Sequence, residues 1–132
     1  MIKSFQLGLY SIFLGRHMDA SEWIILYTKE IEHAELARKS GNEGKARVCA
    51  RRAAGIIIGE YIRRQGYTTL TNSAYDRLRL FVNHPDVSDQ IKIISSHFLN
   101  RVNPDYKLPI DADLIVEARW LAHELLGLTY VD

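Results

Sequence analysis

Two arginines spaced one helical turn apart, Arg47 and Arg51, are the residues of this chain best placed to bind a ligand. They belong to the stretch KARVCARRAAGIIIGEYIRR, residues 45–64, in which most other residues are alanine, glycine or isoleucine. A guanidinium donates paired hydrogen bonds to a carboxylate or a phosphate. Arg47 and Arg51 therefore predict either internal salt bridges or a site for an anion or a nucleotide.

The other basic side chains of this stretch point in a different direction. On an α-helix, at about 100° per residue, Lys45, Arg52 and Arg63 share one direction, which is not that of Arg47 and Arg51. Two separate clusters do not make the continuous basic stripe of a polyanion-binding helix. We therefore expect Lys45, Arg52 and Arg63 to lie on a solvated face of the helix. Carboxylate partners for the basic residues are available earlier in the chain at Glu30, Glu32 and Glu35.

Other chemistry-bearing residues form weaker patterns. His97 and Arg101 are one helical turn apart and suit either a phosphate site or an ordinary surface pair. His123 begins HEL, but residue 127 is glycine, so this is not the HExxH zinc motif. Cys49 is the single cysteine and suits a packed apolar position in a reducing compartment. Glycine-rich phosphate loops and nucleophile elbows are absent from the sequence, and we expect neither a metal nor a cofactor.

Five segments that repeat apolar residues with the period of an α-helix must position these side chains. They lie at about 20–39, 42–65, 69–84, 86–102 and 112–127, and none alternates in the manner of a strand. Phe5, Leu9 and Phe13 recur at every fourth position and predict a short additional helix within residues 1–18. With 132 residues, 47% hydrophobic and 25% charged, the chain suits one domain. We therefore predict an all-α bundle whose neighbouring helices are antiparallel, over residues 19–132.

Acidic and amide side chains are expected to cap the starts of these helices. Asp19 caps the first helix of the bundle, and Asn42 caps the second. Asp86 is the expected cap of the fourth helix, and Asp111 or Asp113 that of the last. Left-handed helix terminators are expected at three glycines: Gly41, Gly66 and Gly127.

The longest helix, at 42–65, is expected to be the centre of the bundle. Its buried face is a sector of small and apolar residues: Ala46, Ala50, Ala53, Ala54, Ile57 and Tyr61. Gly55 and Gly59 lie close to this sector. The lack of a side chain at these two positions allows the backbone of a neighbouring helix to approach closely.

Three segments of the chain resemble the HEPN domain, the higher eukaryotes and prokaryotes nucleotide-binding helical bundle. They are WIILYTKEIEHAELA, GKARVCARRAAGIIIGEYIRRQG and HFLNRVNPDYKLPIDADLIVEARWLAHELL, and the resemblance covers residues 20–126. In that family a late segment of arginine, an aromatic residue, proline and aspartate leads into an acidic-capped last helix. Arg101, Pro104 and Asp105 match this segment, whereas residues 102–103 replace the aromatic residue by Val-Asn.

The resemblance implies a fold and a set of partners. HEPN domains are up-and-down bundles of four or five helices that often form dimers and often act with small nucleotidyltransferases. For this chain it implies a homodimer and a nucleotidyltransferase partner. It also implies a non-catalytic module that binds a nucleotide or an RNA-related ligand, for which Arg47 and Arg51 are the candidate residues. A dimerisation scaffold without a ligand is an alternative.

Some HEPN domains are metal-independent endoribonucleases, including toxins, with an arginine and a histidine separated by four to six residues. Arg79 and His84 fit the four-residue separation, and Arg77 with His84 fits the six-residue one. Such a histidine takes the proton of the 2′-hydroxyl, and the arginine stabilises the phosphorane. With eleven arginines and five histidines the separation occurs readily by chance, and leucine follows both arginines where a polar residue is usual. A ribonuclease that uses Arg79 and His84 is therefore the alternative function.

Charge and hydropathy limit the surroundings in which the chain works. The formal net charge is +1, so the whole molecule has no general attraction to nucleic acid or anionic lipid. No run approaches the length of a membrane span, and no signal-peptide cleavage site follows the apolar N-terminal residues. We expect a cytoplasmic protein without membrane contact.

Overall fold

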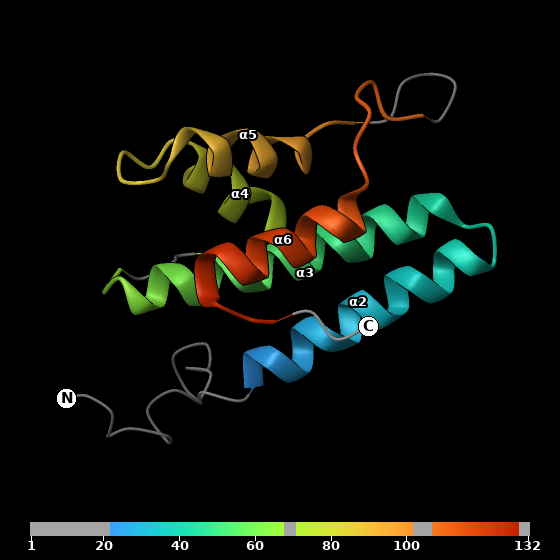
Figure 1. Cartoon of the computed structure of the whole chain (residues 1–132), viewed down its shortest axis with the longest axis horizontal. Helices are drawn as coiled ribbons and strands as arrows, with labels where there is room; N and C mark the ends of the chain where they lie inside the picture. Colours follow the sequence, from blue (N-terminus) through green and yellow to red (C-terminus); the bar gives the residue numbers. More distant parts are fainter. Residues whose placement is uncertain (1–21, 68–70, 102–106, 130–132) are drawn as a thin grey trace.

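The computed structural model describes residues 22–67, 71–101 and 107–129, which form five α-helices and no strand (Figure 1). In chain order the helices are α2 (Glu22–Lys39), α3 (Glu43–Arg64), α4 (Ala74–Val82), α5 (Asp89–His97) and α6 (Leu114–Leu126). The all-α prediction is therefore confirmed. The helix predicted within residues 1–18, the Asp19 cap and residues 102–106 of the HEPN-like segment lie outside the described residues.

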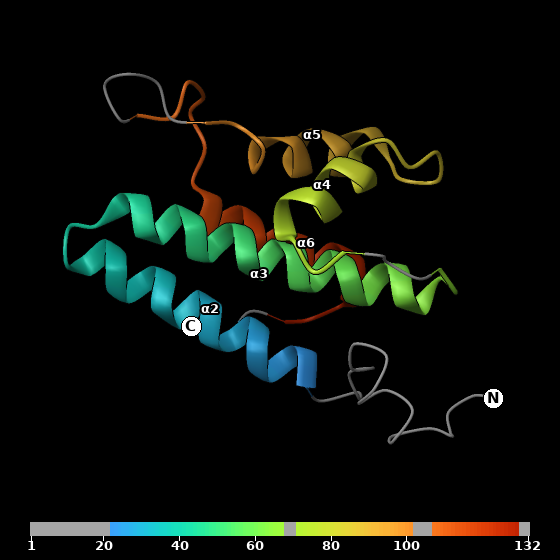
Figure 2. The same ribbon diagram turned by 180° about the vertical axis from the view of Figure 1, so that it is seen from behind.

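Helix α3 is the centre of this bundle, as predicted. It forms an antiparallel hairpin with α2, and α6 lies along it (Figure 1). Figure 2 shows α4 and α5 together on the side of α3 that faces away from α2. None of the five described helices combines the length and the apolar character that crossing a membrane requires.

Side-chain caps set the starts of α3 and α6 as predicted. The Oδ1 atom of Asn42 accepts a hydrogen bond from the N–H of Lys45 at 3.1 Å. Asp113, and not Asp111, caps α6, because its Oδ1 accepts from the N–H of Ile115 at 3.1 Å. The predicted glycine terminators all have positive φ angles: Gly41, Gly66 and Gly127.

The predicted cap of α5 is wrong. The hydroxyl of Ser88 caps this helix by accepting a hydrogen bond from the N–H of Ile91 at 3.3 Å. Asp86 lies two residues earlier, in a turn that is closed by a bond from the N–H of Val87 to the carbonyl of His84 at 3.4 Å. The side chain of Val87 is buried in the core and anchors this turn. The helix therefore begins only after Val87.

The predicted buried face of α3 is also confirmed. Five of its six residues have no exposed surface: Ala46, Ala50, Ala53, Ala54 and Ile57. The sixth, Tyr61, is partly exposed. The first turn of α4 lies so close to Gly55 that a Cβ atom added there would stand 2.6 Å from the Cβ of Ala74. A Cβ atom added to Gly59 would stand 2.6 Å from Nη1 of Arg77. Gly55 is thus required by the packing of α4 on α3, whereas a side chain at Gly59 would displace the guanidinium of Arg77.

The carboxylate of Glu60, near the end of α3, is buried and binds two arginines of the next helical turn, Arg63 and Arg64. Its side chain is 3% exposed and accepts hydrogen bonds from Arg63 Nη2 at 2.7 Å and from Arg64 Nε at 2.9 Å. The guanidinium of Arg64 lies 5.5 Å from the centroid of the Trp23 ring in α2. Burial acts to raise the pKa of Glu60, but the bonds from the two arginines outweigh it and the pKa is lowered.

Replacing Gly55 by alanine should destabilise the fold, although alanine is the better helix former. The added methyl group meets Ala74, and separating the two backbones should lower the free energy of unfolding by about 1–3 kcal/mol. Gly44→Ala in the same helix is the matched control, because its added methyl meets nothing closer than 3.8 Å. It should raise stability by up to about 1 kcal/mol. Urea denaturation measures both variants, and equal effects would mean that the contact with Ala74 does not constrain the fold.

Glu60 should make the stability of the fold depend on pH in the acidic range. Its pKa is lower in the folded than in the unfolded protein, so its contribution is complete above the unfolded value of about 4.3. This contribution is lost as the pH falls through the lower folded value. Glu60→Gln should be less stable than the wild type near neutral pH, and the difference should shrink in acid.

The measurement is the free energy of unfolding in urea over a series of pH values. Glu32→Gln is the control, because Glu32 is exposed on α2. A Glu60→Gln deficit that stays constant from neutral to acidic pH would contradict the assignment.

Candidate functional site

Two arginines from distant parts of the chain lie near the same tyrosine. Arg51 lies on α3, Arg101 follows α5, and Tyr75 is in the first turn of α4. The guanidinium carbon of Arg101 is 6.0 Å from the centroid of the Tyr75 ring. Burial lowers the pKa of Arg51; of its two neighbours, Tyr75 acts to raise this pKa and the charge of Arg101 acts to lower it. These three residues, Arg51, Tyr75 and Arg101, are called the cationic edge below.

The packing of α4 and α5 on α3 positions the cationic edge. The contact between Ala74 and Gly55 fixes the first turn of α4 and with it Tyr75. Phe98, at the end of α5, is fully buried, and its carbonyl accepts a hydrogen bond from Nε of Arg51 at 2.8 Å. Carbonyl groups at the C-terminus of a helix have no partner inside the helix, so the guanidinium satisfies one of them.

Arg51 has no carboxylate partner among the described residues. Its bond to Phe98 uses the Nε–H, which leaves the N–H groups of both Nη atoms for a ligand. A half-buried cation beside a second cation is costly, because burial removes water and the two charges repel each other. An anion held by Arg51 and Arg101 would relieve both effects and would accept charge-assisted hydrogen bonds.

Arg47, the other predicted ligand-binding residue, lies near the start of α3. Hydrogen bonding from Arg38 lowers the pKa of Glu43, and the nearby charge of Arg47 adds to this shift. The Nε atom of Arg47 is buried and has no hydrogen-bond partner in the described part of the chain. The salt bridges predicted as one alternative for Arg47 and Arg51 are not formed there, because no ion pair between described residues includes either arginine.

Other arginines of the bundle are paired with carboxylates. Arg38 of α2 bridges Glu43 at 2.8 Å and Asp113 at 3.0 Å, which joins α2 to the starts of α3 and α6. Arg119 of α6 pairs with Glu35 of α2. The sequence offered Glu35 as a partner for α3, but its carboxylate binds α6 instead. The contrast with these paired arginines marks Arg51 and Arg101 as candidates for an external anion.

His97 and Arg101 contact different residues in the described part of the chain. Nδ1 of His97 lies 2.9 Å from Oε1 of Glu117, so its described partner is a carboxylate of α6. Arg101 turns instead toward Tyr75. For His97 and Arg101 the described contacts show neither of the two alternatives, a phosphate site or a surface pair. They show instead an α5–α6 contact for His97 and the cationic edge for Arg101.

The predicted ribonuclease pair lies at the far end of α4. Arg79 is exposed in the last turn of this helix. His84 follows the helix, accepts a hydrogen bond from the N–H of Asp86 on Nδ1 at 3.2 Å, and stacks edge-on against Tyr67 at 5.6 Å. This leaves Nε2 as the nitrogen that could transfer a proton. The catalytic role of Arg79 and His84 stays a prediction.

Sequence patterns identified only part of the cationic edge. Arg51 was found from its spacing to Arg47, and Arg101 from its place in the HEPN-like segment. Tyr75 was not identified, because nothing in the sequence joins α4 to Arg51 or Arg101. In the described residues no group of three histidine, cysteine, aspartate or glutamate side chains is arranged to hold a metal ion.

Comparisons with known proteins add no further information on the site. No family model matches the chain, and searches of curated proteins and of solved structures gave no match.

Arg51→Met should change the stability of the fold only slightly. The substitution removes one hydrogen bond to Phe98, but it also removes a half-buried charge that Arg101 repels. We expect the free energy of unfolding to change by less than about 1 kcal/mol in either direction.

Arg38→Met is the matched control, because it removes the same group and breaks two ion pairs between helices. It should destabilise the protein more than Arg51→Met in urea denaturation. An equal or larger loss for Arg51→Met would make Arg51 a structural residue.

Proposed function

We propose that this chain is a non-catalytic helical module of HEPN type that binds single-stranded RNA or a nucleotide at the cationic edge. The observation that carries the proposal is the proximity of Arg51 and Arg101, two cations without a described carboxylate partner, to Tyr75. The side chains offer the two kinds of contact that an unpaired nucleotide needs. Guanidiniums bind phosphate, and an aromatic ring stacks on a base.

The arrangement suits recognition better than hydrolysis. Arg51 is held by the Phe98 carbonyl, so it presents its Nη groups in a fixed direction. Arg101 is exposed and can follow the backbone of the ligand. The group that could act as a general base, His84, is at the other end of α4 from Tyr75. A ribonuclease site at Arg79 and His84 would therefore be separate from the proposed binding surface.

The local nature of the site limits the affinity that we expect. The formal net charge of the chain is +1, so the attraction comes from a few side chains. Binding should weaken with salt, but with a shallow slope, because the slope scales with the number of phosphate contacts. The resemblance to HEPN domains extends the proposal to a homodimer and to a small nucleotidyltransferase partner. A second copy or such a partner would add contacts that one described protomer lacks.

Fluorescence anisotropy with a short labelled oligouridylate at low salt tests the proposal. Arg51→Met and Arg101→Ala should each weaken binding by about tenfold, the loss of one charge-assisted phosphate contact. Tyr75→Leu should weaken it to a similar extent, since stacking on an aromatic ring contributes about 1–3 kcal/mol per base. Arg63→Ala is the control. This substitution removes the same charge from α3, but at an arginine that is paired with Glu60.

The proposal is wrong if the oligonucleotide does not bind, or if Arg63→Ala weakens binding as much as the three site variants do. The same RNA is then separated on a denaturing gel after long incubation. Cleavage that disappears in His84→Ala would establish the ribonuclease alternative. Stable dimers that bind no RNA or nucleotide would favour the ligand-free scaffold.

A further inference from the structure

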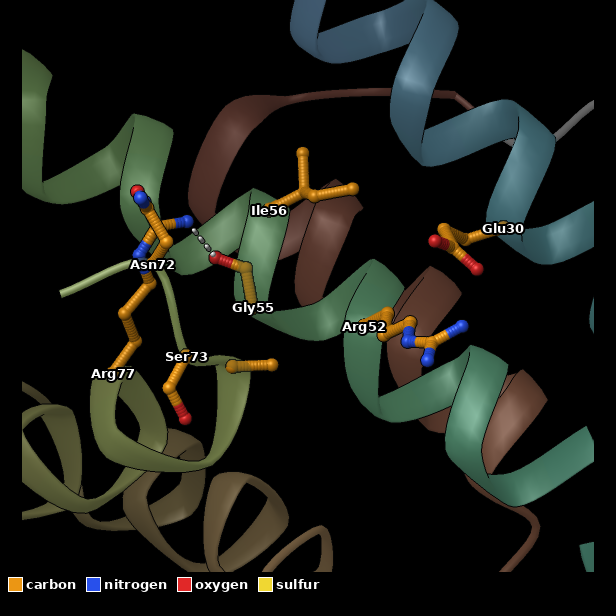
Figure 3. A pocket seen from close by; sticks show the side chains of 8 residues that line it. Glu30, Arg52, Gly55, Ile56, Asn72, Ser73 and Arg77 are labelled. Carbon is orange, nitrogen blue, oxygen red and sulfur yellow. Dashed lines mark hydrogen bonds between the residues drawn. The ribbon is translucent and has the colours of Figure 1, made fainter. Parts of the chain in front are cut away.

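A pocket of about 380 Å³ opens between α2, α3 and the start of α4, away from the cationic edge (Figure 3). Its chemistry comes mainly from Glu30, Arg52, Asn72, Ser73 and Arg77. The volume lies within the range of small-molecule sites. Arg52 is the neighbour of Arg51 on α3, but successive helical residues point about 100° apart, so the two arginines serve different faces of the helix.

One end of the pocket is formed by Arg77. Its Nε donates to the carbonyl of Thr71 at 3.0 Å, and its Nη1 donates to the carbonyl of Gly55 at 3.3 Å (Figure 3). Burial lowers the pKa of this guanidinium, and no described carboxylate pairs with it. Its Nη2 group has no described acceptor. This end therefore offers an anion a fixed, partly desolvated cation.

The start of α4 lies between the two ends. The hydroxyl of Ser73 accepts from the N–H of Asp76 at 3.2 Å and caps the helix. The amide of Asn72 and the positive end of the α4 dipole are on the same wall. These groups favour a negatively charged ligand group near Arg77.

The opposite end of the pocket holds a carboxylate and a second arginine. Figure 3 shows Glu30 from α2 and Arg52 from α3 together at this end, with Gly55 and Ile56 between them and Arg77. Oε1 of Glu30 is buried and has no hydrogen-bond partner among the described residues. The carboxylate also lies beside the thiol of Cys49, whose pKa is raised by burial and further by the charge of Glu30. No described ion pair joins Glu30 to Arg52. The part of the Glu30 carboxylate that lines the pocket offers a hydrogen-bond acceptor to donors of a ligand.

We infer that this pocket binds a small phosphate monoester that carries hydroxyl groups, of the size of a mononucleotide. The phosphate lies at Arg77 and the start of α4, and the hydroxyl groups donate to Glu30. A free inorganic phosphate satisfies only the first end, and an uncharged nucleoside only the second. The inference does not rest on the proposed function, because none of the residues of the cationic edge lines the pocket.

Isothermal titration calorimetry with adenosine 5′-monophosphate, ribose 5-phosphate, inorganic phosphate and adenosine tests the inference. At least one of the two esters should bind, and phosphate alone and adenosine alone should bind at least about tenfold more weakly. Equal binding of both esters would assign the pocket to a sugar phosphate, and a preference for the nucleotide would assign it to a mononucleotide.

Three variants decide whether the ester occupies this pocket. Glu30→Gln should weaken ester binding by about tenfold and leave phosphate binding unchanged, because it removes an acceptor for hydroxyl groups. Arg77→Lys keeps the charge but loses the fork of donors, and it should weaken binding of the ester and of phosphate alike. Arg52→Ala alters an exposed side chain and should weaken ester binding without loss of fold.

Lys45→Ala is the control, because it removes the same charge from an exposed position of α3 outside the pocket. Circular dichroism checks the fold of each variant. If Arg77→Lys does not fold, the two single variants Glu30→Gln and Arg52→Ala show whether the ester occupies the pocket. The inference is overturned if neither ester binds at millimolar concentration, or if the pocket variants bind the ester as well as Lys45→Ala does. Arg51→Met should keep ester binding even if it loses RNA, which separates this result from that of the cationic edge.

Discussion

The close approach of α3 and α4 at Gly55 is the constraint on which both candidate sites depend. The backbones come so near that even a methyl group on Gly55 would collide with Ala74. From this contact Tyr75 reaches Arg101, while Ser73 and Arg77 line the pocket. A wider separation of the helices would move these groups away from α3. A glycine that weakens a helix by its intrinsic propensity is therefore explained here by packing.

The charge of the bundle is balanced overall but unevenly distributed. Arg38 and Arg63 bind carboxylates, and these pairs tie helices together or lie along α3. Arg51 and Arg77 are more deeply placed, and in the described residues they bind only backbone carbonyls. A carbonyl carries a partial charge, so it orients a guanidinium without neutralising it. The structure thus fixes two cations in position and leaves most of their charge for another partner.

Local patterns predicted the fold well because helix period, caps and glycine terminators are properties of a few adjacent residues. Asn42, Asp113 and the alanine face of α3 act as the sequence indicated. The cap at Asp86 was wrong because burial of Val87, a tertiary contact, decides where α5 begins.

The candidate sites were less predictable for the same reason. Spacing identified Arg51, but which side chains meet it depends on how α4 and the end of α5 pack on α3. The positions of Glu30 and Glu35 on α2 likewise do not reveal that Glu30 lines the pocket and that Glu35 binds Arg119 of α6. Pairings between helices require the relative rotation of those helices, which no single segment of the sequence specifies.

Burial of Arg51 and Arg77 has a consequence for stability as well as for binding. Their pKa values fall, but an arginine starts so far above neutral pH that both side chains stay charged. Burial of these charges therefore lowers the free energy of unfolding. The hydrogen bonds to carbonyl groups offset this destabilisation only in part. An anion that binds the folded protein removes part of this cost and stabilises the fold by mass action. The same desolvation that makes these arginines unfavourable in the free protein thus favours anion binding at each of them.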